Sequence, residues 1–408
     1  MQTNTFPLTD SIHWVGVNDY DLRVFDIVME TKLGTTYNAY LVRGKNKTAL
    51  IDTAKANFSD DFVAKVESLV DIKEIDYLIL NHTEPDHSGA VSRILEKNPD
   101  ITIIASGPGL SNLKEILNRP FNSLRATEDL KISLGDKELS FFILPNLHWP
   151  DTIFTYLPEE KTLFTCDFFG AHYAFEGVLA KNVPNKDDYL EGLKNYFDSI
   201  MSPFKPFVLT ALERIKDLEL DYIATSHGPV LDHTIMDEAK SLYREWATTR
   251  KETDLPLVVV ALASAYGYTA KIASTVIATL KSEFAGKIEI ELYDVVETRT
   301  EKIVSRIEKA DAFLIGTTTI LKDAVKPIWD ILGSLNPEIH GGKFASAFGS
   351  YGWSGEGVIN VMARLSQLRM KTIDGLRIRF NPSDEQLKLA VDYAKQFAEL
   401  LKPKQKGL

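Results

Sequence analysis

The chain has 408 residues, of which 44% are hydrophobic and 25% charged, a composition typical of folded globular proteins and not of disordered or collagen-like chains. Its 57 acidic residues outnumber its 46 basic ones and give a net charge of −11, which argues against nucleic acid or an anionic membrane as the main partner. The single cysteine, Cys166, excludes a disulfide within the chain and any iron–sulfur, rubredoxin-type or zinc site built from cysteines alone.

The first half of the chain groups strand-like runs with helix-like segments between the groups. A helix is predicted at residues 60–70, where the apolar residues follow a helical period. Strands are predicted at residues 12–17, 37–42, 48–52, 77–81, 101–105, 139–144, 152–157, 162–166 and 222–225. This pattern predicts an α+β domain or layered sandwich over residues 1–250.

Potential metal ligands crowd into the segment that directly follows the strand predicted at 77–81. Residues 81–89 read Asn-His-Thr-Glu-Pro-Asp-His-Ser-Gly, so His82, Glu84, Asp86 and His87 fall within six positions. A loop at the C-terminal end of a strand can direct several side chains to one place. We therefore expect a metal site here; the alternative is a solvated polar turn that caps the next helix.

Three more candidate ligands stand where other predicted strands open into loops. They are His148, Asp167 and His227. Each alone is more simply structural, but with the cluster they make four histidines and three carboxylates, enough for two metal ions with open positions. Imidazole and carboxylate donors without thiolate suit iron or manganese as well as zinc.

The second half begins after a polar segment at residues 244–255, which we interpret as a linker ended by Pro256. The continuous apolar run at 257–264 is typical of a strand buried on both faces of a parallel sheet. Four more strands are predicted at 288–295, 312–317, 344–349 and 376–380. Helices are predicted at 269–284, 300–309, 325–335, 355–367 and 383–401. Five strand–helix units predict a doubly wound α/β domain over residues 254–402.

Three loops of this domain predict a flavin mononucleotide (FMN) site at the C-terminal ends of the strands. The loop at 264–269 offers hydroxyls and a glycine at a helix N-terminus, which suits a terminal phosphate. It matches neither the dinucleotide glycine fingerprint nor the Walker sequence. Loops at 316–320 and 350–355 would frame the flavin ring. The candidate FMN-binding residues are Ser264, Ala265, Tyr266, Gly267, Tyr268, Thr269, Thr317, Thr318, Thr319, Ile320, Ser350, Tyr351, Gly352, Trp353 and Gly355.

The first half resembles the metallo-β-lactamase fold and the second half resembles flavodoxin. Zinc hydrolases of the former fold carry His-x-His-x-Asp-His, whereas this chain has Glu84 at the second position. That variant, followed by a flavodoxin-like half, is similar to the flavodiiron proteins (A-type flavoproteins). The resemblance implies an αββα sandwich with one iron held by His82, Glu84 and His148, a second held by Asp86, His87 and His227, and Asp167 bridging them.

The same resemblance implies a function. Flavodiiron proteins reduce dioxygen to water or nitric oxide to nitrous oxide, with electrons passing through FMN to the iron pair. It further implies a head-to-tail homodimer or homotetramer, and an external donor such as rubredoxin or a reduced deazaflavin. His172 and Tyr196 are candidates to face the metal site, His172 as a proton donor; the alternative for both is a structural role.

Two other interpretations stay open at this stage. One is a dinuclear zinc hydrolase fused to a flavodoxin-like domain, and the other is a flavin electron-transfer module whose metal half is structural. Tyr268, Leu321 and Lys322 depart from the residues usual in flavodoxin-like loops, which weakens the detailed ring contacts. We expect a cytoplasmic location, because the N-terminus has no signal-like segment and no apolar run reaches the ~20 residues of a membrane helix.

Overall fold

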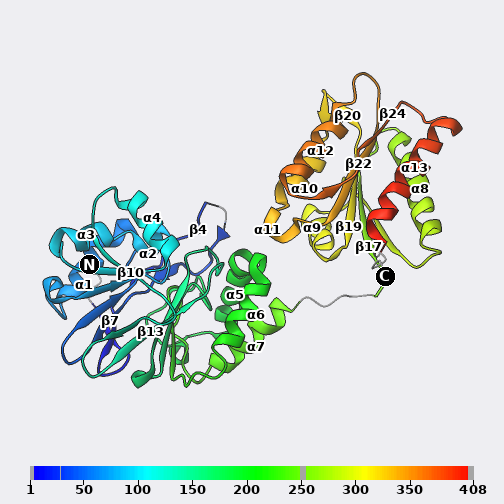
Figure 1. The fold of residues 1–408 in the computed structure, drawn as a ribbon. Helices are drawn as coiled ribbons and strands as arrows, with labels where there is room; N and C mark the ends of the chain where they lie inside the picture. The colour runs from blue at the N-terminus through cyan, green and yellow to red at the C-terminus, as the bar shows by residue number, and fades with distance from the viewer. Residues whose placement is uncertain (1–3, 28, 249–253, 403–408) are drawn as a thin grey trace. The chain divides into compact units, whose positions relative to one another are not determined.

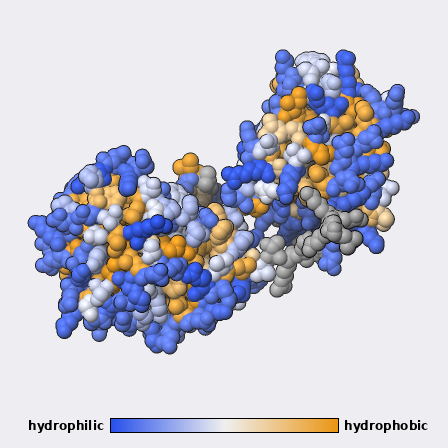
Figure 2. Space-filling model, in the orientation of Figure 1, coloured by the Kyte–Doolittle hydropathy of each residue, from blue (hydrophilic) through white to orange (hydrophobic). Residues whose placement is uncertain are grey.

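The computed structural model describes residues 4–27, 29–248 and 254–402, which form two compact units (Figure 1). The first unit ends at Thr249 and the second begins at Arg250. The domain boundary expected from the sequence falls at residues 250–254, mostly within 249–253, which lie outside the described residues. Figure 2 shows polar and charged residues over most of the visible surface of each unit. Within the described ranges, no helix is long and apolar enough to cross a membrane.

Two sheets form the centre of the first unit. The larger sheet has the strand order β1-β2-β7-β8-β9-β10-β11 and the smaller one the order β12-β13-β14-β15-β16. The strands of the larger sheet are β1 (Phe6–Pro7), β2 (Ile12–Trp14), β7 (Tyr40–Arg43), β8 (Thr48–Ile51), β9 (Tyr77–Ile79), β10 (Thr102–Ala105) and β11 (Asn122–Arg125). Those of the smaller sheet are β12 (Lys131–Ser133), β13 (Glu138–Ile143), β14 (Ile153–Leu157), β15 (Thr162–Cys166) and β16 (Tyr222–Thr225). Two short hairpin-like pairs join β3 (Val17–Asp19) to β6 (Thr35–Tyr37) and β4 (Val24–Phe25) to β5 (Met29–Glu30).

Helices cover the outer face of each sheet. Strand β8 shows why: Ala49 and Ile51 pack between the two sheets, while Leu50 packs against the helices on the other face. Helices α1 (Ser59–Glu67), α3 (Val91–Lys97) and α4 (Gly107–Leu117) cover the larger sheet. Helices α5 (Lys186–Tyr196), α6 (Lys205–Arg214) and α7 (Met236–Ala247) cover the smaller one. The expected αββα sandwich is confirmed.

The second unit is a parallel sheet with helices on both faces. Strand β17 (Leu257–Leu262) is fully buried, with Val258 and Val260 facing one helical layer and Val259 facing the other. The strand order is β18-β17-β19-β22, with β23 and β24 both beside β22, as in flavodoxin-like sheets. The other strands are β18 (Glu289–Asp294), β19 (Ala312–Gly316), β22 (Phe344–Tyr351), β23 (Lys371–Thr372) and β24 (Leu376–Arg379). Helices α8 (Tyr268–Glu283) and α13 (Asp384–Leu401) cover one face, and α9 (Thr300–Lys309), α10 (Lys326–Ser334) and α12 (Glu356–Gln367) the other.

Two local features differ from the sequence-based expectations. Helix α7 continues to Ala247, because Tyr243 and Ala247 pack into the core, so the polar segment begins later than expected. The strand expected at 12–17 is divided into β2 and β3 at Gly16. A Cβ atom at this glycine would lie 2.5 Å from the carbonyl oxygen of Tyr37, so the chain turns here through a space that only glycine fits.

Candidate metal centre and flavin pocket

The loop between β9 and the short helix α2 (Pro85–Ser88) carries the clustered ligands. Glu84 is the residue before the helix, and Pro85 starts it, a position where proline suits the helix geometry. The loop is held by Asp52, whose carboxylate accepts hydrogen bonds from the backbone and side-chain amides of Asn81 at 2.8 and 3.1 Å. Thr155 on β14 donates to the Asn81 amide oxygen at 2.6 Å, which ties the loop to the second sheet.

Four side chains converge on one point at the edge of the two sheets. Glu84 Oε2 lies 3.0 Å from His82 Nε2 and 3.1 Å from His148 Nε2. Asp167 Oδ2 lies 3.4 Å from His148 Nε2 and 3.7 Å from His82 Nε2. One potential ligand atom from each of these residues lies within 4.8 Å of the others. The arrangement presents two imidazoles and two carboxylates to a single position.

A second group lies on the other side of Asp167. Asp86 Oδ2 is 3.3 Å from His87 Nε2 and 3.2 Å from His227 Nε2. The other oxygen of Asp167, Oδ1, is 3.0 Å from His87 Nε2 and 3.5 Å from His227 Nε2. The two oxygens of Asp167 therefore face different groups, as a bridging carboxylate requires.

Several ligand atoms of these groups lack hydrogen-bond partners, and this observation tests whether metal ions fit the site. Both carboxylate oxygens of Asp86, both ring nitrogens of His87 and Asp167 Oδ2 are buried without a hydrogen bond. Buried polar atoms without partners are costly, and coordination to a cation satisfies them. The donor set of imidazole nitrogens and carboxylate oxygens fits iron, manganese or zinc. The residues present therefore fit two ions bridged by Asp167.

Hydrogen bonds outside the ligand groups orient the rings. His82 Nδ1 is 2.9 Å from Asp151, which also accepts from the backbone N–H of Thr83 at 2.8 Å and from its hydroxyl at 2.5 Å. His227 Nδ1 donates to the carbonyl oxygen of Thr36 at 2.6 Å. In each ring the Nε2 atom is left to face the ligand group, which is how outer hydrogen bonds fix a ligating tautomer.

The charges of the cluster shift the protonation of its histidines. Burial lowers the pKa of His87, but the charges of Asp86 and Asp167 outweigh it and raise the pKa to about 10. Burial likewise lowers the pKa of His148, but its interactions with Asp167 and Glu84 outweigh it and raise the pKa to about 9. When no ion is bound, protonated histidines therefore offset the negative charges of the carboxylates. A metal ion must displace these protons to bind.

His172 and Tyr196 lie beside the second group and belong to neither. The His172 and Tyr196 rings lie 5.2 and 5.8 Å from the His227 ring, centroid to centroid. His172 Nδ1 is 2.9 Å from the hydroxyl of Thr35, while its Nε2 has no partner. Burial, followed by the neighbouring His227, holds the pKa of His172 well below its usual range, so its ring is neutral. The Phe25 ring covers that of His172 at 4.3 Å.

Several residues near the centre were not predicted from the sequence. Asp52, Thr35 and Thr36 hold ligands or their loop, and Asp26 lies close enough to Glu84 and Asp86 for burial and their charges to raise its pKa. Asp52 has a sequence signal, since it follows β8 directly as the ligands follow other strands. The others lie in the β3–β6 region, far from the ligand motif in the sequence, and carry no such signal.

Cys166 meets His87 and Asp167 in a third possible group of ligand atoms. Burial raises the pKa of the Cys166 thiol well above its usual value, so it stays protonated and is a poor ligand.

The second unit holds a pocket of about 450 Å³ at the C-terminal ends of β17, β19 and β22. It is lined by most of the loop residues predicted for FMN: Ser264, Ala265, Tyr266, Tyr268, Thr269, Thr318, Thr319, Ile320, Ser350, Tyr351, Gly352 and Trp353. Four further residues line it that were not among those candidates, namely Leu321, Lys322, Ser354 and Phe380. A pocket with hydroxyls at a helix N-terminus and aromatic rings at its rim fits a flavin phosphate and ring.

Three of the residues predicted for FMN do not line this pocket. Thr317 is buried and its hydroxyl donates to the carbonyl oxygen of Thr318 at 2.9 Å. Gly267 and Gly355 stand at the N-terminal ends of α8 and α12 with positive φ angles of 78° and 74°. These two glycines shape the loops through their backbones.

Comparisons with known proteins agree with this two-part arrangement. A model described as "ODP family beta lactamase" matches residues 35–228, and a flavodoxin model matches residues 260–393. Flavo-diiron protein FprA2 of Clostridium acetobutylicum is 40% identical over 397 residues, which cover 96% of this chain and 98% of that protein. The chain belongs to the flavodiiron protein family. Its membership of this family makes it an oxidoreductase.

Two further members of the family bear on its chemistry. The solved structure of rubredoxin:oxygen oxidoreductase from Desulfovibrio gigas is similar with a TM-score of 0.65 and 26% identity, covering 99% of this chain and all of that one. The anaerobic nitric oxide reductase flavorubredoxin of Escherichia coli is 29% identical over 95% of this flavodiiron chain and 81% of that protein.

Proposed function

We propose that this flavodiiron protein reduces dioxygen to water, nitric oxide to nitrous oxide, or both, with electrons passing from an external donor through FMN to a non-haem iron pair. The observation that carries the proposal is the convergence of seven ligand side chains, with orphaned ligand atoms, in the same chain as a flavin-sized pocket. The names of the two relatives, an oxygen oxidoreductase and a nitric oxide reductase, support the two substrates.

The ligands divide into two sets around Asp167. His82, Glu84 and His148 would hold one iron, and Asp86, His87 and His227 the other. Three carboxylates bring three negative charges against the four positive charges of two ferrous ions, so a bridging hydroxide leaves the centre near neutral, which a buried site tolerates. When bound, the flavin accepts electrons from the donor and the iron pair supplies them to the substrate.

The chain's own residues prepare this site. Asp151 and the Thr36 carbonyl hold His82 and His227 at Nδ1, so that Nε2 of each ring faces the ligand group that would hold an ion. Ser226 donates to Asp167 Oδ1 at 2.9 Å and fixes the bridging carboxylate. Burial of the ligands excludes bulk water, and the neutral ring of His172 can hold a proton-carrying water at its free Nε2.

The pocket of the second unit would complete the electron path by holding FMN. The loop from Ser264 to Thr269 would bind the FMN phosphate, and Tyr351 or Trp353 would lie against the ring. We propose that residues 1–250 form the metal domain and residues 254–402 the FMN domain, and that chains pair head to tail as a homodimer or homotetramer. The donor would be rubredoxin, as in the name of the Desulfovibrio gigas relative, or a reduced deazaflavin.

The test is gas consumption by protein that contains both cofactors. Reduced rubredoxin as the electron source should support uptake of dioxygen or formation of nitrous oxide. Glu84→Ala should abolish both reactions while flavin reduction continues, and Glu67→Ala, on the surface of α1, should change neither. Wild-type protein with two irons and FMN that consumes neither gas would overturn the proposal.

A further inference from the structure

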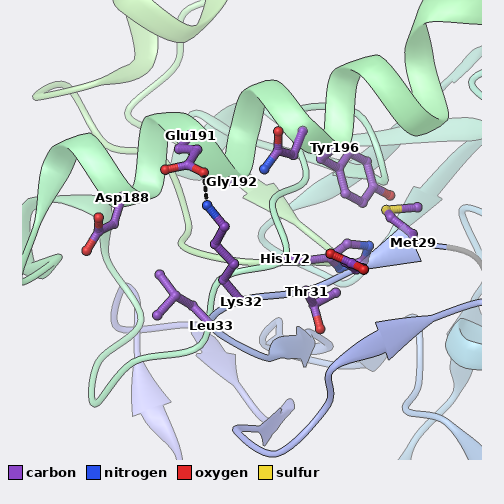
Figure 3. A pocket seen from close by; sticks show the side chains of 11 residues that line it. Met29, Thr31, Lys32, Leu33, His172, Asp188, Glu191, Gly192 and Tyr196 are labelled. Carbon is purple, nitrogen blue, oxygen red and sulfur yellow. Dashed lines mark hydrogen bonds and ion pairs between the residues drawn. The ribbon is translucent and has the colours of Figure 1, made fainter. Parts of the chain in front are cut away.

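A cavity of about 180 Å³ lies between residues 29–33 and helix α5, as Figure 3 shows. The α5 residues that line it share one face of the helix, since they are spaced by three or four positions. They are Asp188, Glu191, Gly192, Asn195 and Tyr196. The opposite wall is formed by Met29, Glu30, Thr31, Lys32 and Leu33, and His172 lies at the bottom.

The cavity runs inward from the protein surface. Lys32 and Glu191 form an ion pair at its mouth, where their side chains are 75% and 51% exposed (Figure 3). His172 and Tyr196 are only 7% and 2% exposed and form its inner end. The space therefore connects solvent with two side chains that lie beside the metal ligands.

The wall between this cavity and the metal centre is one side chain thick. The rings of His172 and Tyr196 lie 4.9 Å apart, and each contacts the ring of His227. His172 Nε2 is buried and makes no hydrogen bond. The cavity thus ends beside the ligand group formed by Asp86, His87 and His227.

The other opening of the centre is at the opposite ligand group. Glu84 and His148 have side chains that are 14% and 15% exposed, whereas the side chains of the other five ligands are at most 6% exposed. An electron-transfer partner is a protein-sized group and can approach only such an exposed edge. A diatomic molecule needs far less room, and a partner seated on this edge would block it there.

Gly192 lines the cavity from helix α5 with no side chain. A Cβ atom at this position would meet only the His172 carbonyl oxygen at 3.6 Å and Tyr173 Cβ at 3.9 Å, which are ordinary contacts. Glycine inside a helix is less favourable than alanine, and here neither packing nor a positive φ requires it. A larger residue at this place would fill the cavity.

We propose that this cavity is the route by which the diatomic substrate reaches the metal centre, entering beside the Lys32–Glu191 ion pair and passing Gly192 to the His172–Tyr196 wall. The inference rests on the proposed function for the identity of the substrate, dioxygen or nitric oxide. The route itself is a property of the folded chain and can be tested without turnover.

The first test uses fluorine NMR on the full chain with 3-fluorotyrosine and diamagnetic zinc in the metal centre. Dissolved dioxygen is paramagnetic, so it should broaden and shift the Tyr196 resonance, assigned with Tyr196→Phe. Tyr243, equally buried in the aromatic cluster behind α5 but outside the cavity, is the internal control. Gly192→Leu should reduce the Tyr196 response to that of Tyr243. A wild-type Tyr196 that responds no more than Tyr243 would overturn the route.

The second test measures association of nitric oxide with the reduced diiron protein by stopped-flow absorbance. Gly192→Leu should slow association about tenfold, because a blocked path lowers the on-rate. Gly333→Leu is the matched control, since Gly333 lies in helix α10 with nothing within 4 Å of its added Cβ. Leu33→Trp blocks the cavity from the other wall if the leucine variant does not fold.

The outcomes separate the two proposals. If wild-type diiron protein does not react with either gas, the proposed function fails, while the fluorine experiment still decides whether dioxygen enters the cavity. If wild-type protein reacts and both cavity variants associate with nitric oxide as fast as Gly333→Leu, the route is wrong and the proposed function stands.

Discussion

Replacing Asp151 by asparagine should weaken metal binding at His82 without changing the size of the side chain. Asp151 is buried and accepts three hydrogen bonds, from His82 Nδ1 and from the N–H and hydroxyl of Thr83. An asparagine can keep both Thr83 contacts only by turning its NH₂ group toward His82 Nδ1. That nitrogen then becomes an acceptor, and the ring proton moves to Nε2, the atom that faces Glu84.

The loss should be about 10- to 100-fold in affinity for one of the two ions, the range typical of outer-sphere partners of metal-ligating histidines. This corresponds to about 1.4 to 2.7 kcal/mol. The assay is competition with a chelator of known affinity, read as metal retained per chain. Asp232→Asn is the control, because Asp232 is equally buried and accepts a hydrogen bond from the backbone N–H of Thr234, while its own side chain belongs to neither ligand group. Asp151→Asn protein that retains both ions as tightly as the control would refute the reasoning.

Four further predictions follow from other parts of the structure. Leu321 and Lys322 form a two-residue hairpin turn with φ angles of 52° and 63°, a conformation that asparagine and glycine adopt at lower cost. Replacing them by Asn-Gly should raise the unfolding free energy of the flavin-free protein by about 1 to 2 kcal/mol in urea titrations, and a decrease would contradict this. Burial lowers the pKa of Lys65 from 10.5 to about 8, so between pH 8 and pH 10.5 the unfolded chain binds more protons than the folded chain. The free energy of unfolding should therefore rise with pH across this window, and Lys65→Met should remove that rise. Removing the metal ions should lower the melting temperature, and returning them at 100 times their Kd should restore about 2.7 kcal/mol; an unchanged melting temperature would count against a bound centre. Tyr351→Ala should weaken FMN binding about tenfold in fluorescence titrations, because an aromatic wall of the pocket is lost, and unchanged affinity would place the ring elsewhere.

Local signals in the sequence predicted the elements that depend on local chemistry. Strand β17 was predicted because its continuous apolar run is typical of a strand covered on both faces, and helix α9 was predicted with the bounds that the structure shows. The seven candidate ligands were predicted because they cluster in the sequence or lie where predicted strands open into loops, and the structure brings their side chains together. A metal count on the purified protein tests whether these ligands hold iron.

The residues that were missed depend on contacts between distant segments. Phe380 lines the flavin pocket because β24 pairs with β22 and its backbone N–H donates to the Tyr351 carbonyl oxygen at 2.8 Å. Thr35 meets His172 across 137 positions of sequence. Helix α5 was also not predicted, although Asn185 caps its N-terminus and two acidic residues follow, a start signal that the sequence does contain. The cavity beside α5 could not be foreseen, because its opposite wall comes from residues 29–33, a distant segment of the chain.

The measurement that tests the central claim most directly is a metal and flavin count on one sample of protein purified without added metals. The account predicts two irons and one FMN per chain, the pair of cofactors that the seven ligands and the pocket of the second unit would hold. Two zinc ions with no flavin would contradict it and would favour a hydrolase built on the same ligands.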